Sequence, residues 1–147
     1  MDITIGQIET EDDFEAVRGL VREFFGFAQS VDPHAHEASG FAGLEAELAS
    51  LPGICRPPSG AFLLARVDGA PMGCGASFDH GGGKVEVKRM YVRPEARGLS
   101  LGRGIVEGLL NRARALGNDR IVLSTYYKLE AAQALYARMG FSRCAPT

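Results

Sequence analysis

The sequence predicts a single α/β domain of the α+β type over residues 1–147. Three consecutive segments with strand-like alternation lie in the middle of the chain, and segments with helical spacing lie on both sides of them. The chain has 147 residues, of which 46% are hydrophobic and 23% charged. This is enough for one buried core but not for a second full domain.

The first fifty residues are expected to form a strand followed by two helices. Residues 3–8 alternate apolar and polar side chains. Thr10, followed by three acidic residues, suits a helix N-cap and an acidic first turn. One helical face then carries Phe14, Val17, Val21, Phe24 and Phe25. A polar loop is expected at 30–40, and helical spacing returns at 41–51 before Pro52 and Gly53 end it.

The rest of the chain is expected to form a hairpin, a third strand and a helix–strand–helix segment. The turn DGAP separates two strands at 61–67 and 72–78, and the turn DHGGG at 79–83 precedes a strand at 84–92. A helix is expected from Leu101 or Gly102 to a stop at Gly117. Its apolar stripe consists of Ile105, Leu109, Ala113 and Leu116. A strand at 120–126 and a helix at 129–140 follow.

Composition limits the classes of function. No stretch approaches the roughly 18 apolar residues of a membrane span, and the first residues are acidic rather than a basic leader, so we expect a soluble cytoplasmic protein. Cys55, Cys74 and Cys144 are odd in number and widely spaced, which favours reduced, mostly buried thiols over a disulfide framework or a zinc site.

Charge is divided unevenly between the two parts of the chain. Residues 1–50 hold eleven acidic and two basic side chains, and residues 51–147 hold seven acidic and fourteen basic ones. A nucleic-acid binder would more usually be basic overall, with clustered aromatic residues, so we expect no nucleic-acid partner. The basic part suggests a smaller anion as ligand.

The segment RPEARGLSLGRG at 93–104 is the strongest chemical signal in the sequence. It joins an expected strand to an expected helix and contains three glycines and three arginines. Helix N-terminal amides and glycine backbone suit phosphate oxygens, although a plain turn with solvent-facing arginines explains the spacing equally well. A Walker A loop is excluded because GK[ST] is missing, and a Rossmann fingerprint because GxGxxG is missing.

These residues resemble the GNAT superfamily of N-acetyltransferases, whose acetyl-CoA motif is [Q/R]-x-x-G-x-[G/A] after a strand. Residues 97–102 match this motif except that Ser100 replaces its first glycine. The strand and loop VEVKRMYVRPEARG resemble those of one bacterial subgroup, and LEAAQALYARMGF resembles the family's A-x-x-L-Y-x-x-x-G-F helix. The resemblance covers nearly the whole chain.

The resemblance implies a mostly antiparallel mixed sheet with helices on both faces, and acetyl-CoA as cosubstrate without a metal. In the family, the strand before the motif splays from its neighbour and pairs with the pantetheine arm and the thioester, which points to Met90, Tyr91 and Val92. Backbone amides of the next segment would hold the pyrophosphate. These belong to Arg97, Gly98, Leu99, Ser100, Leu101, Gly102 and Arg103.

The resemblance also implies a catalytic acid. Tyr136 matches the family tyrosine that protonates the leaving thiolate, and the alternative is a core tyrosine between Leu135 and Phe141. Leu129 stands where the family often has an asparagine, so any contact from that asparagine is absent.

Glu86 is the best candidate for the base that accepts the proton of the attacking amine, since strand alternation would place it on one face with Lys88 and Met90. The alternative for Glu86 is an exposed carboxylate paired with Lys88.

The acceptor is expected to be a primary amine on a small molecule or a peptide. We expect acidic residues of the first two helices, such as Glu23, Asp32 and Glu37, to attract a cationic amine. His34 and His36 lack a third metal ligand at suitable spacing and are possible acceptor-side residues. A non-catalytic acyl-CoA-binding module is the alternative function, because Ser100 and Leu129 depart from the family pattern.

The C-terminal end also differs from the family pattern. Relatives continue past the GF pair with a closing strand, whereas this sequence ends six residues after Phe141. The final strand is therefore expected to be missing from this sequence. The sheet edge is then either left open or completed by a second subunit in a homodimer.

Overall fold

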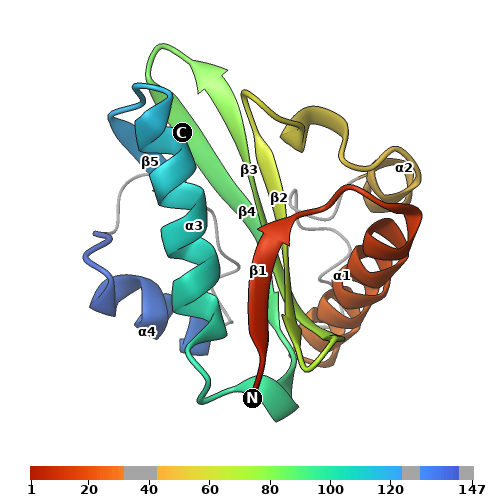
Figure 1. The fold of residues 1–147 in the computed structure, drawn as a ribbon. Coiled ribbons are helices and arrows are strands. Elements are labelled where there is room, and N and C mark those ends of the chain that lie inside the picture. The colour runs from red at the N-terminus through yellow and green to blue at the C-terminus, as the bar shows by residue number, and fades with distance from the viewer. Residues whose placement is uncertain (32–42, 124–129, 143–147) are drawn as a thin grey trace.

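A computed structural model gives the structure of the protein and describes residues 1–31, 43–123 and 130–142. The chain forms one five-stranded sheet with helices packed around it (Figure 1). The strands are β1 (Ile3–Gln7), β2 (Ala61–Val67), β3 (Ala70–Gly81), β4 (Lys84–Val92) and β5 (Arg120–Leu123). The helices are α1 (Glu11–Val31), α2 (Leu44–Ala49), α3 (Leu101–Ala115) and α4 (Glu130–Arg138), with short 3-10 turns η3 (Gly53–Cys55) and η4 (Pro94–Ala96).

The strands lie in the sheet in the order of the sequence. Strands β1 to β4 pair antiparallel, and β5 pairs parallel to β4. This confirms the expected mixed, mostly antiparallel sheet. The parallel pair requires a crossover, and α3 supplies it between β4 and β5.

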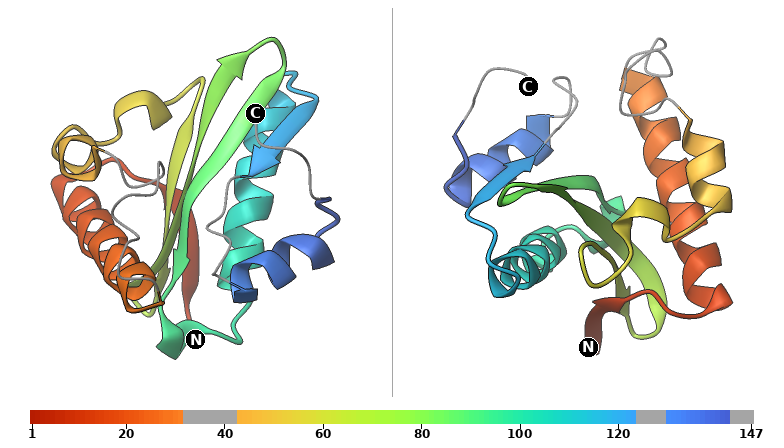
Figure 2. Two further views of the ribbon diagram at one scale, coloured as in Figure 1. Left: turned by 180° about the vertical axis from the view of Figure 1, so that it is seen from behind. Right: turned by 90° about the horizontal axis from the view of Figure 1, so that it is seen from above.

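Helices cover both faces of the sheet, as expected (Figure 2). Helices α1 and α2 pack on one face, which we call the α1 face, and α3 packs on the other, which we call the α3 face. The core of the α1 face includes Val17, Leu20, Val21, Leu48 and Phe62. The core of the α3 face includes Leu63, Val87, Leu101, Ile105 and Leu109.

The start of α1 follows from its capping residues. The Thr10 Oγ1 atom accepts a hydrogen bond from the Asp13 backbone N–H at 3.2 Å, and Asp13 Oδ2 accepts from the Thr10 N–H at 3.2 Å. This reciprocal arrangement satisfies amides that the helix leaves without partners. Val17 and Val21 are buried, and Phe14, Phe24 and Phe25 pack around them. The expected cap and apolar face are both confirmed.

A β-bulge interrupts β4 in the middle. Cys74 of β3 pairs with Tyr91, and Ala76 pairs with Lys88, so the single residue Gly75 lies opposite two residues of β4. One of these two is Arg89, whose φ of 60° is unusual for a residue with a side chain.

The bulge changes which face the following side chains occupy. Tyr91 belongs to the core of the α1 face, whereas Met90 packs against the core of the α3 face together with Val92. Lys88 is on the α1 face, where its Nζ lies 3.8 Å from a carboxylate oxygen of Glu47. The expectation that Glu86, Lys88 and Met90 share one face was therefore wrong, because strict alternation fails at a bulge.

Three further expectations need correction. Strand β3 runs to Gly81, so Asp79 and His80 lie in a strand and not in the turn at 79–83. Helix α2 begins at Leu44 and not at residue 41. Leu116 is 51% exposed and lies outside the buried stripe of α3, since that helix ends at Ala115.

Some expectations concern residues outside those described. They include Asp32, His34, His36, Glu37, Leu129 and Cys144. The expectation that the final strand is missing concerns residues 143–147, which are also outside the described part.

Candidate active site

Strands β4 and β5 pair over only part of the length of β4. Their register runs from Lys84 opposite Arg120 to Val87 opposite Leu123. Among the described residues, no strand pairs with the β5-facing edge of Lys88–Val92. Backbone N–H and C=O groups along this edge can therefore pair with an extended ligand, as a strand would. The expected residues Met90, Tyr91 and Val92 lie on this open edge.

The segment that follows β4 places the start of α3 next to the open edge. Gly98 and Ser100 both have positive φ, 92° and 61° respectively, and Ser100 is the N-cap of α3. The Gly104 N–H donates to the Ser100 carbonyl at 3.1 Å, as the first bond of the helix ladder. The three preceding amides, of Leu101, Gly102 and Arg103, have no acceptor within the helix, so they are available to an anion.

Two arginines lie beside these amides and face solvent. The Arg97 guanidinium lies 5.9 Å from the centre of the Phe27 ring of α1. Arg103 Nη1 lies 3.7 Å from Glu107 Oε1, and both side chains are about half exposed. Neither contact fixes the guanidinium strongly, since exposed pairs contribute little. Both side chains can therefore turn to a phosphate group.

Helix α4 packs closely against the start of α3 at Gly102. A Cβ atom on Gly102 would lie 2.9 Å from Leu135 Cδ2 of α4 and 3.8 Å from Val92 Cγ2 of β4. Glycine at this position thus lets α4 approach the start of α3, and Figure 1 shows α4 beside the first half of α3. The next residue of α4 is Tyr136, so the expected acid lies on the helix that contacts the anion-binding segment.

Tyr136 is 7% exposed, and its ring makes an edge contact with Phe141, with 6.2 Å between the ring centres. Burial raises the pKa of the Tyr136 phenol above its usual value of about 10. The side chain therefore remains a protonated hydrogen-bond donor at neutral pH. The described contacts fit both an acid and a core tyrosine.

Glu86 is paired differently from the expected alternative. Its Oε1 lies 2.9 Å from Nε2 of His80, which projects from β3 on the same face of the sheet. Lys88 instead approaches Glu47 of α2. The expected pair with Lys88 was therefore wrong. The sequence analysis missed His80 because DHGGG resembles a turn, and only the pairing of Phe78 with Glu86 could have placed it beside Glu86.

A partly buried ion pair holds the bulge of β4 against α2. The Arg89 Nε and Nη2 atoms donate to the two carboxylate oxygens of Glu47 at 2.8 and 2.9 Å, and the Arg89 side chain is 6% exposed. Burial alone would raise the pKa of Glu47, but the hydrogen bonds and charge of Arg89, with Lys88 nearby, lower it on balance. Glu47 thus remains ionised and fixes the residue with the strained backbone.

Glu23, one of the acidic residues expected to attract a cationic amine, is paired with two side chains. The Tyr91 hydroxyl donates to Glu23 Oε2 at 2.8 Å, and Arg93 Nε donates to the same oxygen at 3.1 Å. Burial is the main cause that raises the pKa of Tyr91, and the neighbouring carboxylate of Glu23 raises it further. The cationic Arg93 offsets the charge of Glu23, so this carboxylate contributes to packing between α1 and β4.

The buried thiols are poor nucleophiles. Cys55 and Cys74 are free and buried, and burial raises their pKa values to about 11 and about 12. A thiol in this state carries little thiolate at neutral pH. Within the described part of the chain, no group of three potential metal ligands occurs, and no helix is long and apolar enough to cross a membrane.

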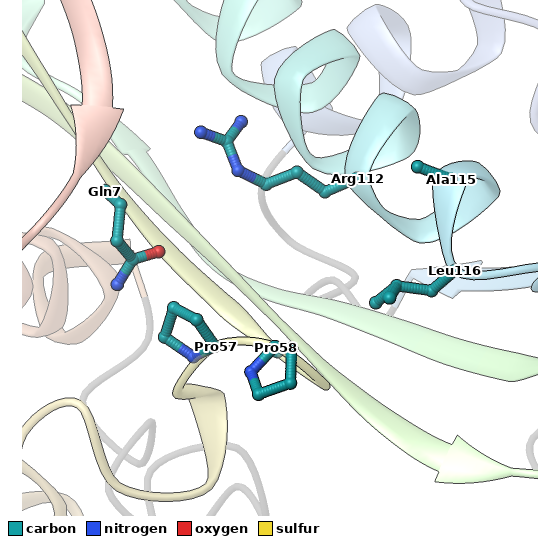
Figure 3. Close-up of a pocket in the computed structure, with 7 residues that line it drawn as sticks. Gln7, Pro57, Pro58, Arg112, Ala115 and Leu116 are labelled. Carbon is teal, nitrogen blue, oxygen red and sulfur yellow. The ribbon is translucent and has the colours of Figure 1, made fainter.

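A separate hollow lies at the far end of α3. It has a volume of about 280 Å³, and Figure 3 shows its walls at the end of β1, the loop before β2 and the end of α3. The lining residues are Gln7, Pro57, Pro58, Gly60, Arg112, Ala115 and Leu116. Since the hollow lies at the C-terminal end of α3, it is distinct from the anion-binding segment at the N-terminal end.

Two features of the described structure point to the class of protein: β5 runs parallel to the first part of β4, and a glycine-containing helix start follows β4. The model of the Acetyltransferase (GNAT) family matches residues 11–141. The chain belongs to this family and is an N-acetyltransferase by class.

Individual relatives agree with this assignment. An uncharacterised N-acetyltransferase of Schizosaccharomyces pombe is 34% identical over 150 residues, which cover 99% of this chain and 86% of the relative. An IAA acetyltransferase of Azospirillum brasilense is 43% identical over 86 residues, 58% of this chain and 56% of that protein. The PaiA N-acetyltransferase of Thermoplasma acidophilum in complex with coenzyme A superposes with a TM-score of 0.75 at 18% identity, over 97% and 91% of the two chains.

Proposed function

We propose that the protein transfers the acetyl group of acetyl-CoA to a primary amine by direct attack on the bound thioester. The observation that carries this proposal is the position of the open edge of β4 next to the N-terminus of α3. An extended arm that ends in a pyrophosphate fits this arrangement, because the edge offers backbone pairing and the helix start offers free amides. The coenzyme A complex of the PaiA relative supports the same cosubstrate.

Two side chains lie on opposite sides of the open edge and suit the two proton transfers. Glu86 lies on the α1 face, and Tyr136 lies on α4, which packs beside α3. In the proposed reaction, the amine nitrogen forms a bond to the thioester carbon and the C–S bond breaks. Glu86 accepts the proton lost by the amine, and the Tyr136 hydroxyl gives its proton to the departing sulfur. Solvent then returns a proton to the phenol.

A covalent acyl-enzyme is not part of the proposal. The high pKa values of Cys55 and Cys74 leave few thiolates at neutral pH, and both side chains are buried. A direct reaction needs only that the amine reach the thioester in its neutral form. A carboxylate such as Glu86 is suited to this task because it can accept the amine's proton as the bond forms.

The acceptor is proposed to be a small molecule or peptide that carries a primary amine. The Azospirillum relative is named an IAA acetyltransferase, and this name supports a small-molecule acceptor. The pairing of Glu23 with Arg93 and Tyr91 removes one of the carboxylates expected to attract a cation. Attraction of a cationic amine would therefore depend on the other acidic residues of the N-terminal part.

Release of CoA thiol from acetyl-CoA in the presence of an amine panel tests the proposal. We expect thiol release that requires an amine and falls about 100-fold in kcat in the Tyr136→Phe variant, which is typical of losing a positioned acid. The Kd for acetyl-CoA, measured by calorimetry, serves as the control and should stay unchanged, because phenylalanine keeps the ring that packs against Phe141.

The strained conformation of Ser100 in the motif favours one other function, a non-catalytic acyl-CoA-binding module. The same experiment separates the two functions. Binding of acetyl-CoA without turnover on any amine would support the module and overturn the enzyme. Turnover that is equal in wild type and Tyr136→Phe would remove Tyr136 from the mechanism but keep the activity.

A further inference from the structure

His80 lies next to Glu86, the proposed base, and is the more exposed of the two side chains. It lies near the end of β3, two residues after Phe78, which pairs with Glu86 across the hairpin. The register between β3 and β4 shifts between Asp79 and Gly81, so His80 lies at a bulge where alternation does not place its side chain. Its contacts with the Phe78 ring and with Glu86 show that it projects on their side of the sheet. Nε2 of His80 lies 2.9 Å from Glu86 Oε1.

Neighbouring contacts fix the orientation of the imidazole ring. The His80 ring packs against the Phe78 ring with 4.3 Å between centres, and Lys88 Nζ lies 5.5 Å from the centre of that same Phe78 ring. Next to His80, Asp79 Oδ1 accepts a hydrogen bond from the Gly81 N–H at 2.6 Å, which holds the end of the strand. Two partners, an aromatic ring and a carboxylate, therefore determine the position of His80.

We propose that His80 is a positioning residue for Glu86 that also passes the proton of the acceptor amine to water; this inference rests on the proposed function. The His80 side chain is 35% exposed and that of Glu86 is 22% exposed, so the imidazole lies on the solvent side of the pair. Imidazole suits a relay because it can exchange protons near neutral pH.

The proton balance of the relay is simple. Glu86 takes a proton from the amine as the C–N bond forms. Before the reaction, the Nε2–H of His80 donates to the ionised Glu86. Once Glu86 carries the amine's proton, the imidazole exchanges to the tautomer with hydrogen on Nδ1, and its Nε2 atom accepts that proton from the carboxyl group. The resulting imidazolium releases the Nδ1 proton to water, which restores the starting tautomer. No oxidant, metal or other co-reactant is needed.

Several other titratable groups lie around this pair. From β3 and β4, the neighbours include Asp79, Lys84, Lys88 and Arg89, and from α2 and η3 they include Glu47 and Cys55. Glu47 is ionised by its pair with Arg89, and the Cys55 thiol remains protonated because burial raises its pKa to about 11. Neither group is expected to change charge between pH 6 and pH 9.

The test compares kcat of wild type, His80→Gln and His80→Ala between pH 6 and pH 9. Glutamine can still donate to Glu86 but cannot relay a proton. We expect His80→Gln to lose roughly tenfold in kcat at pH 7, at the low end for acid–base residues, because Glu86 remains. The loss should shrink toward pH 9, where hydroxide takes the proton directly, and added imidazole should restore His80→Ala at least in part.

A matched control is Asp79→Asn, which lies beside His80 and keeps the acceptor oxygen for Gly81. It should leave kcat and its pH profile unchanged. A loss in His80→Gln that is constant with pH, together with no rescue of His80→Ala by imidazole, would overturn the relay and leave only a structural role.

A measurement without turnover separates this inference from the proposed function. We expect the ¹⁵N chemical shift of His80 Nε2 to change in the Glu86→Gln variant, because the charged partner is lost. An unchanged chemical shift would show that His80 and Glu86 do not interact and would overturn the inference. If no amine supports turnover in wild type, the proposed function and the relay both fail, and the ¹⁵N shift still decides whether the pair exists.

Discussion

Ser100 is the position where this chain departs from the glycine of its family motif, and its conformation gives a quantitative prediction. Its φ of 61° and ψ of 27° are left-handed, and its side chain makes no capping hydrogen bond that would offset the strain. A residue with a Cβ pays about 1–2 kcal/mol in this region. Glycine removes that strain but loses about 0.5–1 kcal/mol through its freer unfolded chain. The Ser100→Gly variant should therefore gain about 0.5–1 kcal/mol in free energy of unfolding.

Urea unfolding followed by circular dichroism measures this gain as a higher midpoint at an unchanged slope. The melting temperature should rise by about 2–4 °C per kcal/mol for a chain of this size. Ser100→Ala is the matched control, because it removes the hydroxyl but keeps a Cβ and hence the strain, so it should not be stabilised. If Ser100→Gly proved no more stable than Ser100→Ala, the argument from backbone strain would be wrong.

Two further predictions follow from Gly102 and Asp13. In Gly102→Ala, the new Cβ meets Leu135 Cδ2 at 2.9 Å and displaces α4 with Tyr136, so kcat/KM should fall at least about tenfold. Gly19→Ala, whose Cβ meets nothing within 4 Å in α1, should instead gain about 0.5–1 kcal/mol and keep full activity; equal activity of the two variants would refute the contact. Hydrogen bonds from the Glu9 N–H and then from Arg66 lower the pKa of Asp13 to about 2 from 3.8, so its stabilising effect is complete above pH 4 and lost as the pH falls to 2. Urea unfolding over this range should show a smaller loss of stability in Asp13→Asn than in wild type, and parallel curves would contradict the assignment.

Much of the site was accessible from the sequence because its signals are local. The glycines and arginines of 97–103 lie within one short segment, and their anion-binding chemistry follows from the start of a helix. The structure places this segment where the sequence predicts it, at the N-terminus of α3. By contrast, the partner of Glu86 was mistaken, because Lys88 is near in sequence whereas His80 comes from a neighbouring strand. Side chains that meet across a hairpin depend on register, which no short segment determines.

The sequence by itself determined the elements: the Thr10 cap of α1, the hairpin of β2 and β3, the start of α3 and its stop at Gly117. Capping, periodicity and turn chemistry act over a few residues, so each can be recognised where it occurs. Only the tertiary structure decided three features: the bulge at Arg89, the ion pair of that residue with Glu47, and the contact of α4 with Gly102. Each of these depends on which distant segments pack together. Strand β4 pairs with β3 and β5, and α4 packs on α3, so the position of each depends on contacts with segments that are distant in the sequence.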